Sequence, residues 1–111
     1  MTHAALLVLT TLPELEGARS IARALIEARL AACVHIGPAV QSLYHWRGET
    51  ETATEVPLAI KTRTDLYARV EQEIRSRHPY ELPEIVGVPM THGLPAYLDW
   101  IASETAGARD A

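Results

Sequence analysis

Two strand patterns with a turn signal between them lie in the middle of the chain, and they restrict the possible folds more than any other feature. The first strand is predicted over residues 40–46. In the second, predicted over residues 55–61, Val56, Leu58 and Ile60 alternate with their neighbours in the period of a strand. Arg47-Gly48-Glu49 separates the two patterns and is typical of a turn. We therefore predict a β-hairpin.

Two prolines, Pro38 and Pro57, limit how the strands of this hairpin can pair. Gly37-Pro38 lies between residues 32–36 and residues 40–46, which predicts a kink or bulge in one long strand. Pro57 lies inside the second strand but has no N–H to donate. Its nitrogen must therefore face away from a paired neighbour or lie at a bulge.

Strand and helix patterns alternate along the rest of the chain. The continuous apolar run of residues 4–10 predicts a central strand, and residues 14–30 predict a helix with one apolar face. A second helix is predicted from an N-cap at Thr64 to the residues before Pro79, followed by a strand over residues 84–90. A last helix is predicted to begin at Gly93-Leu94-Pro95.

This order predicts an α+β fold, the ferredoxin-like βαββαβ sandwich with an extra C-terminal helix. Both central helices should lie on one face of a four-stranded antiparallel sheet. At 111 residues and 48 % hydrophobic composition, the chain should form a single domain over residues 1–111. We expect residues 103–111 to be a frayed tail.

Composition also restricts function. A net charge of −4 argues against a nucleic-acid partner and against attraction to anionic membranes. No apolar run approaches the roughly 18 residues that a membrane span needs, and the N-terminus lacks the pattern of a signal peptide. The single cysteine, Cys33, cannot form an internal disulfide, which fits a reducing cytoplasm. We therefore expect a cytoplasmic protein.

Metal ligation has three candidate residues. Cys33 and His35 are two residues apart and so share one strand face, where they could bind a soft ion such as Cu(I), although a small buried thiol is the alternative for Cys33. His78 ends a predicted helix within the stretch HPYELPE, where its charge at the helix end is the alternative role. Replacing His78 by alanine should weaken copper binding and leave the melting temperature nearly unchanged. Glu81 could add an oxygen ligand.

Catalytic and nucleotide-binding signatures do not occur in the sequence. The chain has no G-x-G-x-x-G or Walker motif, and no G-x-S-x-G nucleophile motif. No pair of histidines has the spacing of a local zinc site. We predict a protein that is not an enzyme and that requires no cofactor.

Four sequence blocks in a fixed order carry a family resemblance. They are ARLAACVHI (28–36), SLYHWRGE with EVPLAIKT (42–49 and 55–62), HPYELPEI (78–85) and THGLPAYLDWI (91–101). With these blocks the chain resembles the CutA family of divalent-cation tolerance proteins. The resemblance implies a homotrimer in which the long hairpin strands pair across subunits, and a role in tolerance of, or response to, ions such as copper.

Interface or pocket positions are expected within these blocks. They are Trp46, Lys61, Tyr80, Glu81, Glu84 and Trp100. Copper-linked members of the family can carry a cysteine where this chain has Thr10 and a histidine where it has Arg77. The resemblance therefore implies weak copper binding here, micromolar or poorer.

Two other functions remain open from the sequence. Trimeric ferredoxin-like signalling proteins, such as the nitrogen-regulatory PII group, bind small molecules in clefts between subunits, and fold analogy extends this role to the chain. Alternatively, a stable trimer could serve only as an interaction scaffold.

Overall fold

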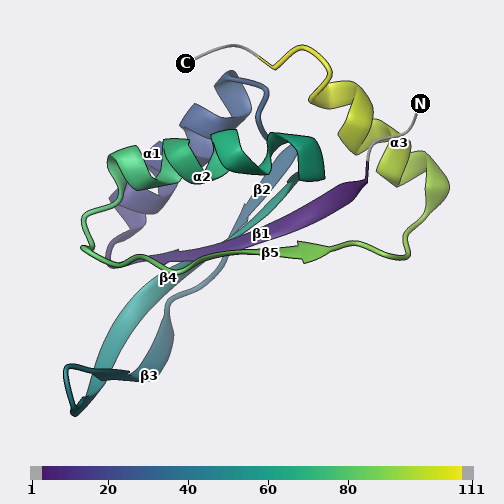
Figure 1. Ribbon diagram of the computed structural model, residues 1–111. Helices are drawn as coiled ribbons and strands as arrows, with labels where there is room; N and C mark the ends of the chain where they lie inside the picture. The colour runs from purple at the N-terminus through teal and green to yellow at the C-terminus, as the bar shows by residue number, and fades with distance from the viewer. Residues whose placement is uncertain (1–3, 109–111) are drawn as a thin grey trace.

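The predicted alternation of strands and helices is present in this computed structural model, which describes residues 4–108 (Figure 1). The elements are β1 (Ala5–Leu12), α1 (Leu15–Glu27), β2 (Cys33–Ile36), β3 (Val40–Trp46), β4 (Glu49–Arg63), the short 3-10 helix η1 (Thr64–Leu66), α2 (Tyr67–Arg77), β5 (Ile85–Pro89) and α3 (Pro95–Glu104). Among residues 4–108, no helix combines the length and apolarity needed to cross a membrane.

The strands form an antiparallel sheet in the order β2-β4-β1-β5, and β3 also pairs with β4. With β2 and β3 counted as one interrupted strand, this is the strand order of the predicted split βαβ arrangement. Helices α1 and α2 lie on one face of the sheet (Figure 1). The predicted α+β fold with an additional C-terminal helix is therefore confirmed.

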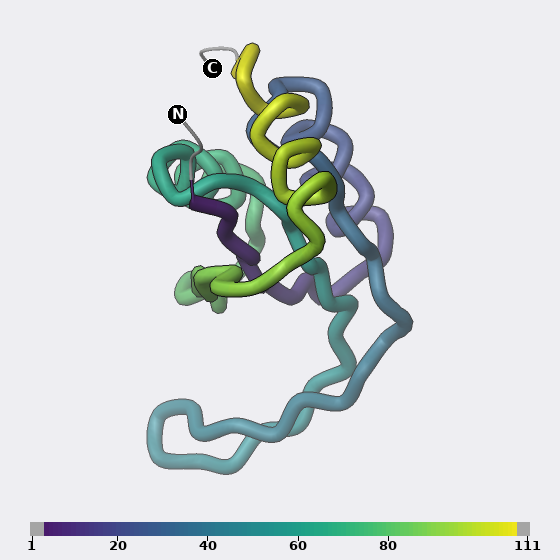
Figure 2. The backbone as a smooth tube through the Cα atoms, turned by 90° about the vertical axis from the view of Figure 1, so that its right-hand side faces the viewer, coloured from purple at the N-terminus to yellow at the C-terminus, as the bar shows by residue number. Residues whose placement is uncertain are grey.

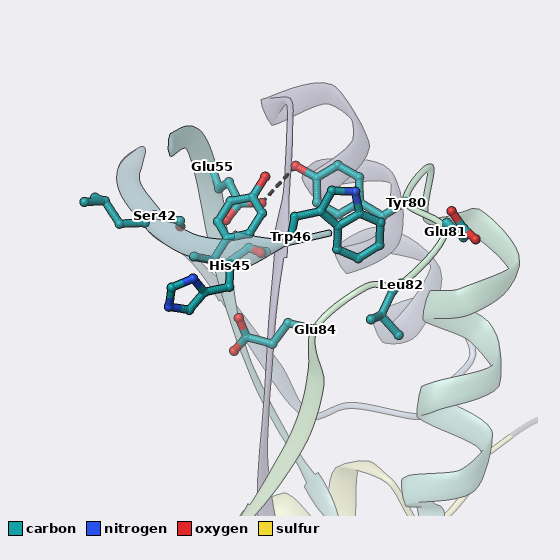
Figure 3. A pocket seen from close by; sticks show the side chains of 11 residues that line it. Ser42, His45, Trp46, Glu55, Tyr80, Glu81, Leu82 and Glu84 are labelled. Carbon is teal, nitrogen blue, oxygen red and sulfur yellow. Dashed lines mark hydrogen bonds between the residues drawn. The ribbon is translucent and has the colours of Figure 1, made fainter. Parts of the chain in front are cut away.

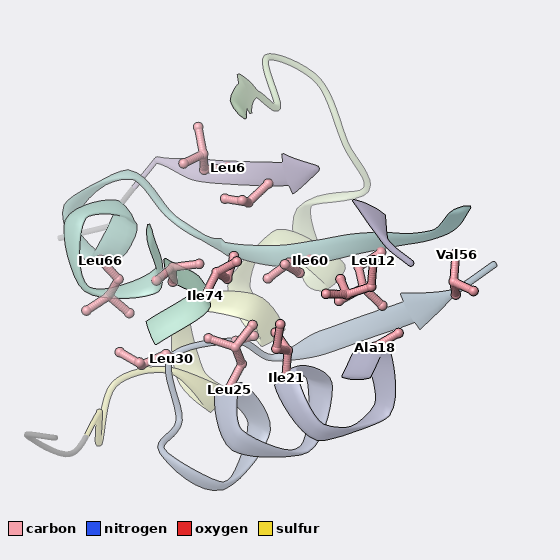
Figure 4. Close-up of a cluster of buried hydrophobic side chains, with 14 residues drawn as sticks. Leu6, Leu12, Ala18, Ile21, Leu25, Leu30, Val56, Ile60, Leu66 and Ile74 are labelled. Carbon is pink, nitrogen blue, oxygen red and sulfur yellow. The ribbon is translucent and has the colours of Figure 1, made fainter. Parts of the chain in front are cut away.

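The core lies between this face of the sheet and the two helices. Alternation places Val8 of β1 and Ile60 of β4 against the helices, and both are fully buried. On the helices, Ile21 and Leu25 of α1 and Ile74 of α2 complete the contact, because their helical spacing puts them on one face (Figure 4). The apolar periodicities of strand and helix thus meet in one cluster.

β4 is longer than the sequence predicts. It begins at Glu49 and runs for 15 residues, whereas the prediction began at residue 55. Its first part pairs with β3, and this hairpin extends away from the helices and curls at its end (Figures 1 and 2). The molecule is accordingly elongated, with extents of 47 × 29 × 23 Å. We call residues 40–55 the arm and the remainder of the sheet with its helices the body.

The kink predicted at Gly37-Pro38 separates β2 from β3. Ile36 pairs with Leu58 and Val40 pairs with Glu55, so residues 37–39 oppose only residues 56–57. This mismatch is a bulge, and Pro57 lies in it as predicted. The strand is therefore interrupted where a proline would otherwise break the ladder.

Three predictions, about where two helices and the C-terminal tail begin or end, need correction. α1 ends at Glu27 rather than near residue 30, because the chain turns at Arg29 with φ of 58° and the N–H of Leu30 donates to Leu25 O. Thr64 does not cap a helix; its hydroxyl donates instead to Ala4 O at 3.4 Å.

The predicted frayed tail is the third correction. Thr105 is fully buried and its hydroxyl donates to Ile101 O at 2.8 Å, while the Arg29 guanidinium donates to Glu104 O. Ala108 packs against the core. Residues 103–108 are therefore packed on the body, and residues 109–111 lie outside the described part of the chain.

Candidate functional site

A groove of about 670 Å³ separates the arm from the loop that joins α2 to β5. Its lining combines aromatic rings with carboxylates, which project from both sides (Figure 3). The lining residues are Thr11, Ser42, Leu43, Tyr44, His45, Trp46, Glu55, Tyr80, Glu81, Leu82 and Glu84. The groove exists because β3 and β4 leave the body at the bulge and curl back toward the loop.

His78 fixes the loop side of this groove. Pro79 ends α2 as predicted, and His78 takes an extended conformation as its C-cap. The Nε2 atom lies 2.7 Å from Thr11 O, and the Tyr80 N–H donates to Nδ1 over 3.2 Å. Since a carbonyl only accepts and an amide N–H only donates, the ring is the neutral tautomer with its proton on Nε2.

To act as the predicted metal ligand, His78 would have to give up one of these hydrogen bonds. A metal binds an imidazole through an unprotonated ring nitrogen. In His78 one nitrogen carries the bonded proton, and the other already accepts from Tyr80. The hydrogen bonds of His78 join the end of β1 to the loop, and Glu81 forms an ion pair with Arg47. Metal ligation by His78 and Glu81 stays a prediction.

Tyr80 extends this hydrogen-bonded chain to the arm. Its hydroxyl donates to Glu55 Oε2 at 2.8 Å, and the Glu55 residue is only 7 % exposed. Burial, then the hydrogen bond to Glu55 and the charge of Glu55, raise the pKa of Tyr80 to about 12. Thr11, His78, Tyr80 and Glu55 thus connect body, loop and arm in one series of contacts.

Arg47 lies in the turn of the hairpin and contacts the loop between α2 and β5. It has φ of 51° in the turn of the hairpin and precedes Gly48 at φ of 82°, the paired positive values that a two-residue hairpin turn requires. Its guanidinium lies 5.2 Å from the centre of the Trp46 ring and 3.2 Å from Glu81 Oε1. A cation is therefore held there between an indole face and a carboxylate.

Cys33 and His35 lie on a different part of the sheet. Both point to the face opposite α1 and α2, where Cys33 is half-buried and His35 is exposed. Cys33 pairs with Lys61, four residues along β4 from Pro57, the partner of Thr11. At about 3.3 Å per residue, this separates the pair from the His78 contact by roughly 13 Å along the strand. Their ligation of a metal stays a prediction.

No cluster of metal-ligating side chains exists within residues 4–108: nowhere do three or more His, Cys, Asp or Glu side chains converge. Thr10 and Arg77, the two positions at which the resemblance implied missing copper ligands, have other contacts in the structure. Thr10 is buried in the core at 1 % exposure, and Arg77 binds Glu73 at 2.7 Å.

The six predicted interface or pocket residues fall into two groups. Trp46, Tyr80, Glu81 and Glu84 line the groove. Lys61 and Trp100 do not, and they meet around Tyr97 of α3 instead. The Lys61 ammonium donates to the Tyr97 hydroxyl at 3.0 Å, and the Tyr97 and Trp100 rings lie 5.5 Å apart.

Two residues of these groups were not singled out from the sequence. Tyr97 precedes Trp100 by three helical positions, a spacing that places both rings on one side of α3 and could have indicated the contact. Glu55 gave no such signal, because a glutamate at a predicted strand end is ordinarily exposed.

Comparison with known proteins identifies relatives over nearly the whole chain. The family model described as CutA1 divalent ion tolerance protein matches residues 6–104. The divalent-cation tolerance protein CutA of Thermus thermophilus is 45 % identical over 98 residues, covering 88 % of this chain and 95 % of that protein. A Protein CutA homolog of Danio rerio is 44 % identical over 96 residues, which are 86 % of this chain but 64 % of that relative.

Solved structures agree with this relationship. The structure of the periplasmic divalent cation tolerance protein CutA from Archaeoglobus fulgidus superposes with a TM-score of 0.88 at 39 % identity. The match covers 91 % of this chain and 98 % of that one. Sequence and fold therefore point to the same family.

Proposed function

The chain belongs to the CutA1 divalent ion tolerance protein family, and on that premise we propose that it is a homotrimer that acts in tolerance of, or response to, divalent ions such as copper. In this proposal the protein catalyses no reaction and needs no cofactor. The observation that carries it beyond the family name is the arm, whose apolar side chains are exposed on the single chain.

Assembly is the first part of the proposal. Leu43 on the arm is 70 % exposed, and Val86 and Val88 on β5 are each 44 % exposed. Among residues 4–108, β5 pairs only with β1 and β3 only with β4, so each keeps one unpaired edge. Such edges favour association with another chain. Light scattering at micromolar concentration should give about three chain masses, and a monomer at that concentration would contradict the trimer.

Weak metal binding is the second part. With no cluster of three ligating side chains in residues 4–108, we expect copper affinity of micromolar or poorer, on the order of 8 kcal/mol or less. Cys33 and His35 are the stronger candidates, because His78 would have to give up a hydrogen bond to bind a metal. Calorimetry with Cu(I) and Cu(II) should show that Cys33→Ala binds less copper while His78→Ala binds as wild type. Loss of binding in His78→Ala alone would reverse this assignment.

A cellular experiment tests the role itself. Cells that lack the gene should grow less well than wild type at raised copper concentrations, and the intact gene should restore growth. The single cysteine supports a cytoplasmic location, whereas the Archaeoglobus fulgidus relative is described as periplasmic. Cell fractionation decides the compartment. Equal growth of the two strains at raised concentrations of several divalent ions would contradict a role in tolerance.

The groove supports a second candidate function, a trimeric sensor of a small molecule. Concave sites with aromatic walls and a few polar groups are typical of ligand-binding sites. A thermal-shift screen with metals, nucleotides and organic ions separates the candidates, because a ligand that binds only the native state raises the melting temperature. No shift with any compound would favour an interaction scaffold.

A further inference from the structure

We draw no further inference here: the strongest candidate, the side-chain cluster of Lys61, Tyr97 and Trp100 on the sheet face opposite α1 and α2, carries nothing, because nothing among the described residues shows what covers that face.

Discussion

β4 passes through two different environments, one exposed and one buried. Over residues 49–54 it pairs only with β3, and five of its six side chains are exposed. Over residues 56–63 it lies between β1 and β2, and Val56, Leu58 and Ile60 are at most 8 % exposed. One continuous strand therefore forms the centre of the body and one side of the arm.

The difference shows that body and arm are stabilised in different ways. Burial of apolar surface, at about 25 cal/mol per Å², can hold the body together without help. A two-stranded hairpin alone is marginally stable in water. In the arm, the exposed Arg47–Glu81 pair contributes roughly 0–1 kcal/mol, and the hydrogen bond from Tyr80 to Glu55 is a second side-chain contact that holds the arm.

The largest expected effect compares one truncation in each region. Ile60→Ala removes a fully buried side chain from the body and should lower the free energy of unfolding by about 2–5 kcal/mol. Leu43→Ala on the arm, where the side chain is 70 % exposed, should cost less than about 1 kcal/mol. Urea denaturation at several protein concentrations measures both. Equal losses of unfolding free energy in the two variants at every protein concentration would contradict the difference between body and arm. A loss for Leu43→Ala that depends on protein concentration would mean that the substitution weakens assembly.

A smaller loss is expected from cutting the contact between the regions. His78→Ala removes the hydrogen bonds to Thr11 O and from the Tyr80 N–H, which are part-buried and exposed, and should cost about 0.5–1.5 kcal/mol. This reverses the expectation from the sequence, which predicted little change in stability. His35→Ala is the control, because that histidine is exposed on β2. If both variants melt together with wild type, the two hydrogen bonds of His78 do not stabilise the fold.

The pH dependence of stability should reveal the Tyr80–Glu55 contact. The pKa of Tyr80 is raised to about 12, whereas a tyrosine in the unfolded chain titrates near 10. Between these pH values the unfolded state loses its proton and the folded state keeps it. The stability that the environment of Tyr80 contributes should therefore be fully present below pH 10 and be lost as the pH rises toward 12.

Tyr80→Phe isolates this contribution. Urea denaturation of wild type and variant from pH 9 to 12 should give a shallower decline for the variant, because its unfolded state no longer releases that proton. Glu55→Gln should also flatten the decline, since it removes the charge that opposes tyrosinate formation. Identical slopes in all three proteins would mean that the contact does not determine the alkaline limit.

The fold of the body was predictable from the sequence because its signals are local. Apolar residues at strand or helix spacing fixed the faces of β1, α1 and α2, and Pro79 fixed the end of α2. The first half of β4 carries no such signal. Its residues are mostly polar, and they form a strand because β3 supplies a partner for each of them.

The candidate site was predictable only in part, for a related reason. Trp46, Tyr80, Glu81 and Glu84 could be selected by residue type, and they do line the groove. The role of His78 depends on Thr11, which is 67 residues away in the chain, and no local pattern contains that contact. The burial of Glu55 likewise follows from the arm bending over Tyr80, so it is visible only in three dimensions.

The smallest expected effect lies at the junction of the two regions, at Pro57. Its carbonyl accepts from the Gly37 N–H at 2.9 Å, and in an antiparallel strand the nitrogen of the same residue faces the same neighbour. That neighbour is the bulge of residues 37–39, so a proline there removes no regular ladder bond.

Pro57→Val should therefore change the free energy of unfolding by less than about 1 kcal/mol, since valine suits a strand and its new N–H faces an irregular segment. Gly37→Ala is the matched variant on the other side of the bulge. A Cβ at residue 37 would lie 3.0 Å from Pro57 Cγ, so this substitution should cost more than Pro57→Val.

Urea denaturation gives both values, and light scattering reports assembly. A larger loss for Pro57→Val would contradict the bulge argument. Unchanged unfolding with a smaller oligomer mass would instead mean that the proline sets the direction of the arm for assembly, because only the arm lies beyond this point of β4.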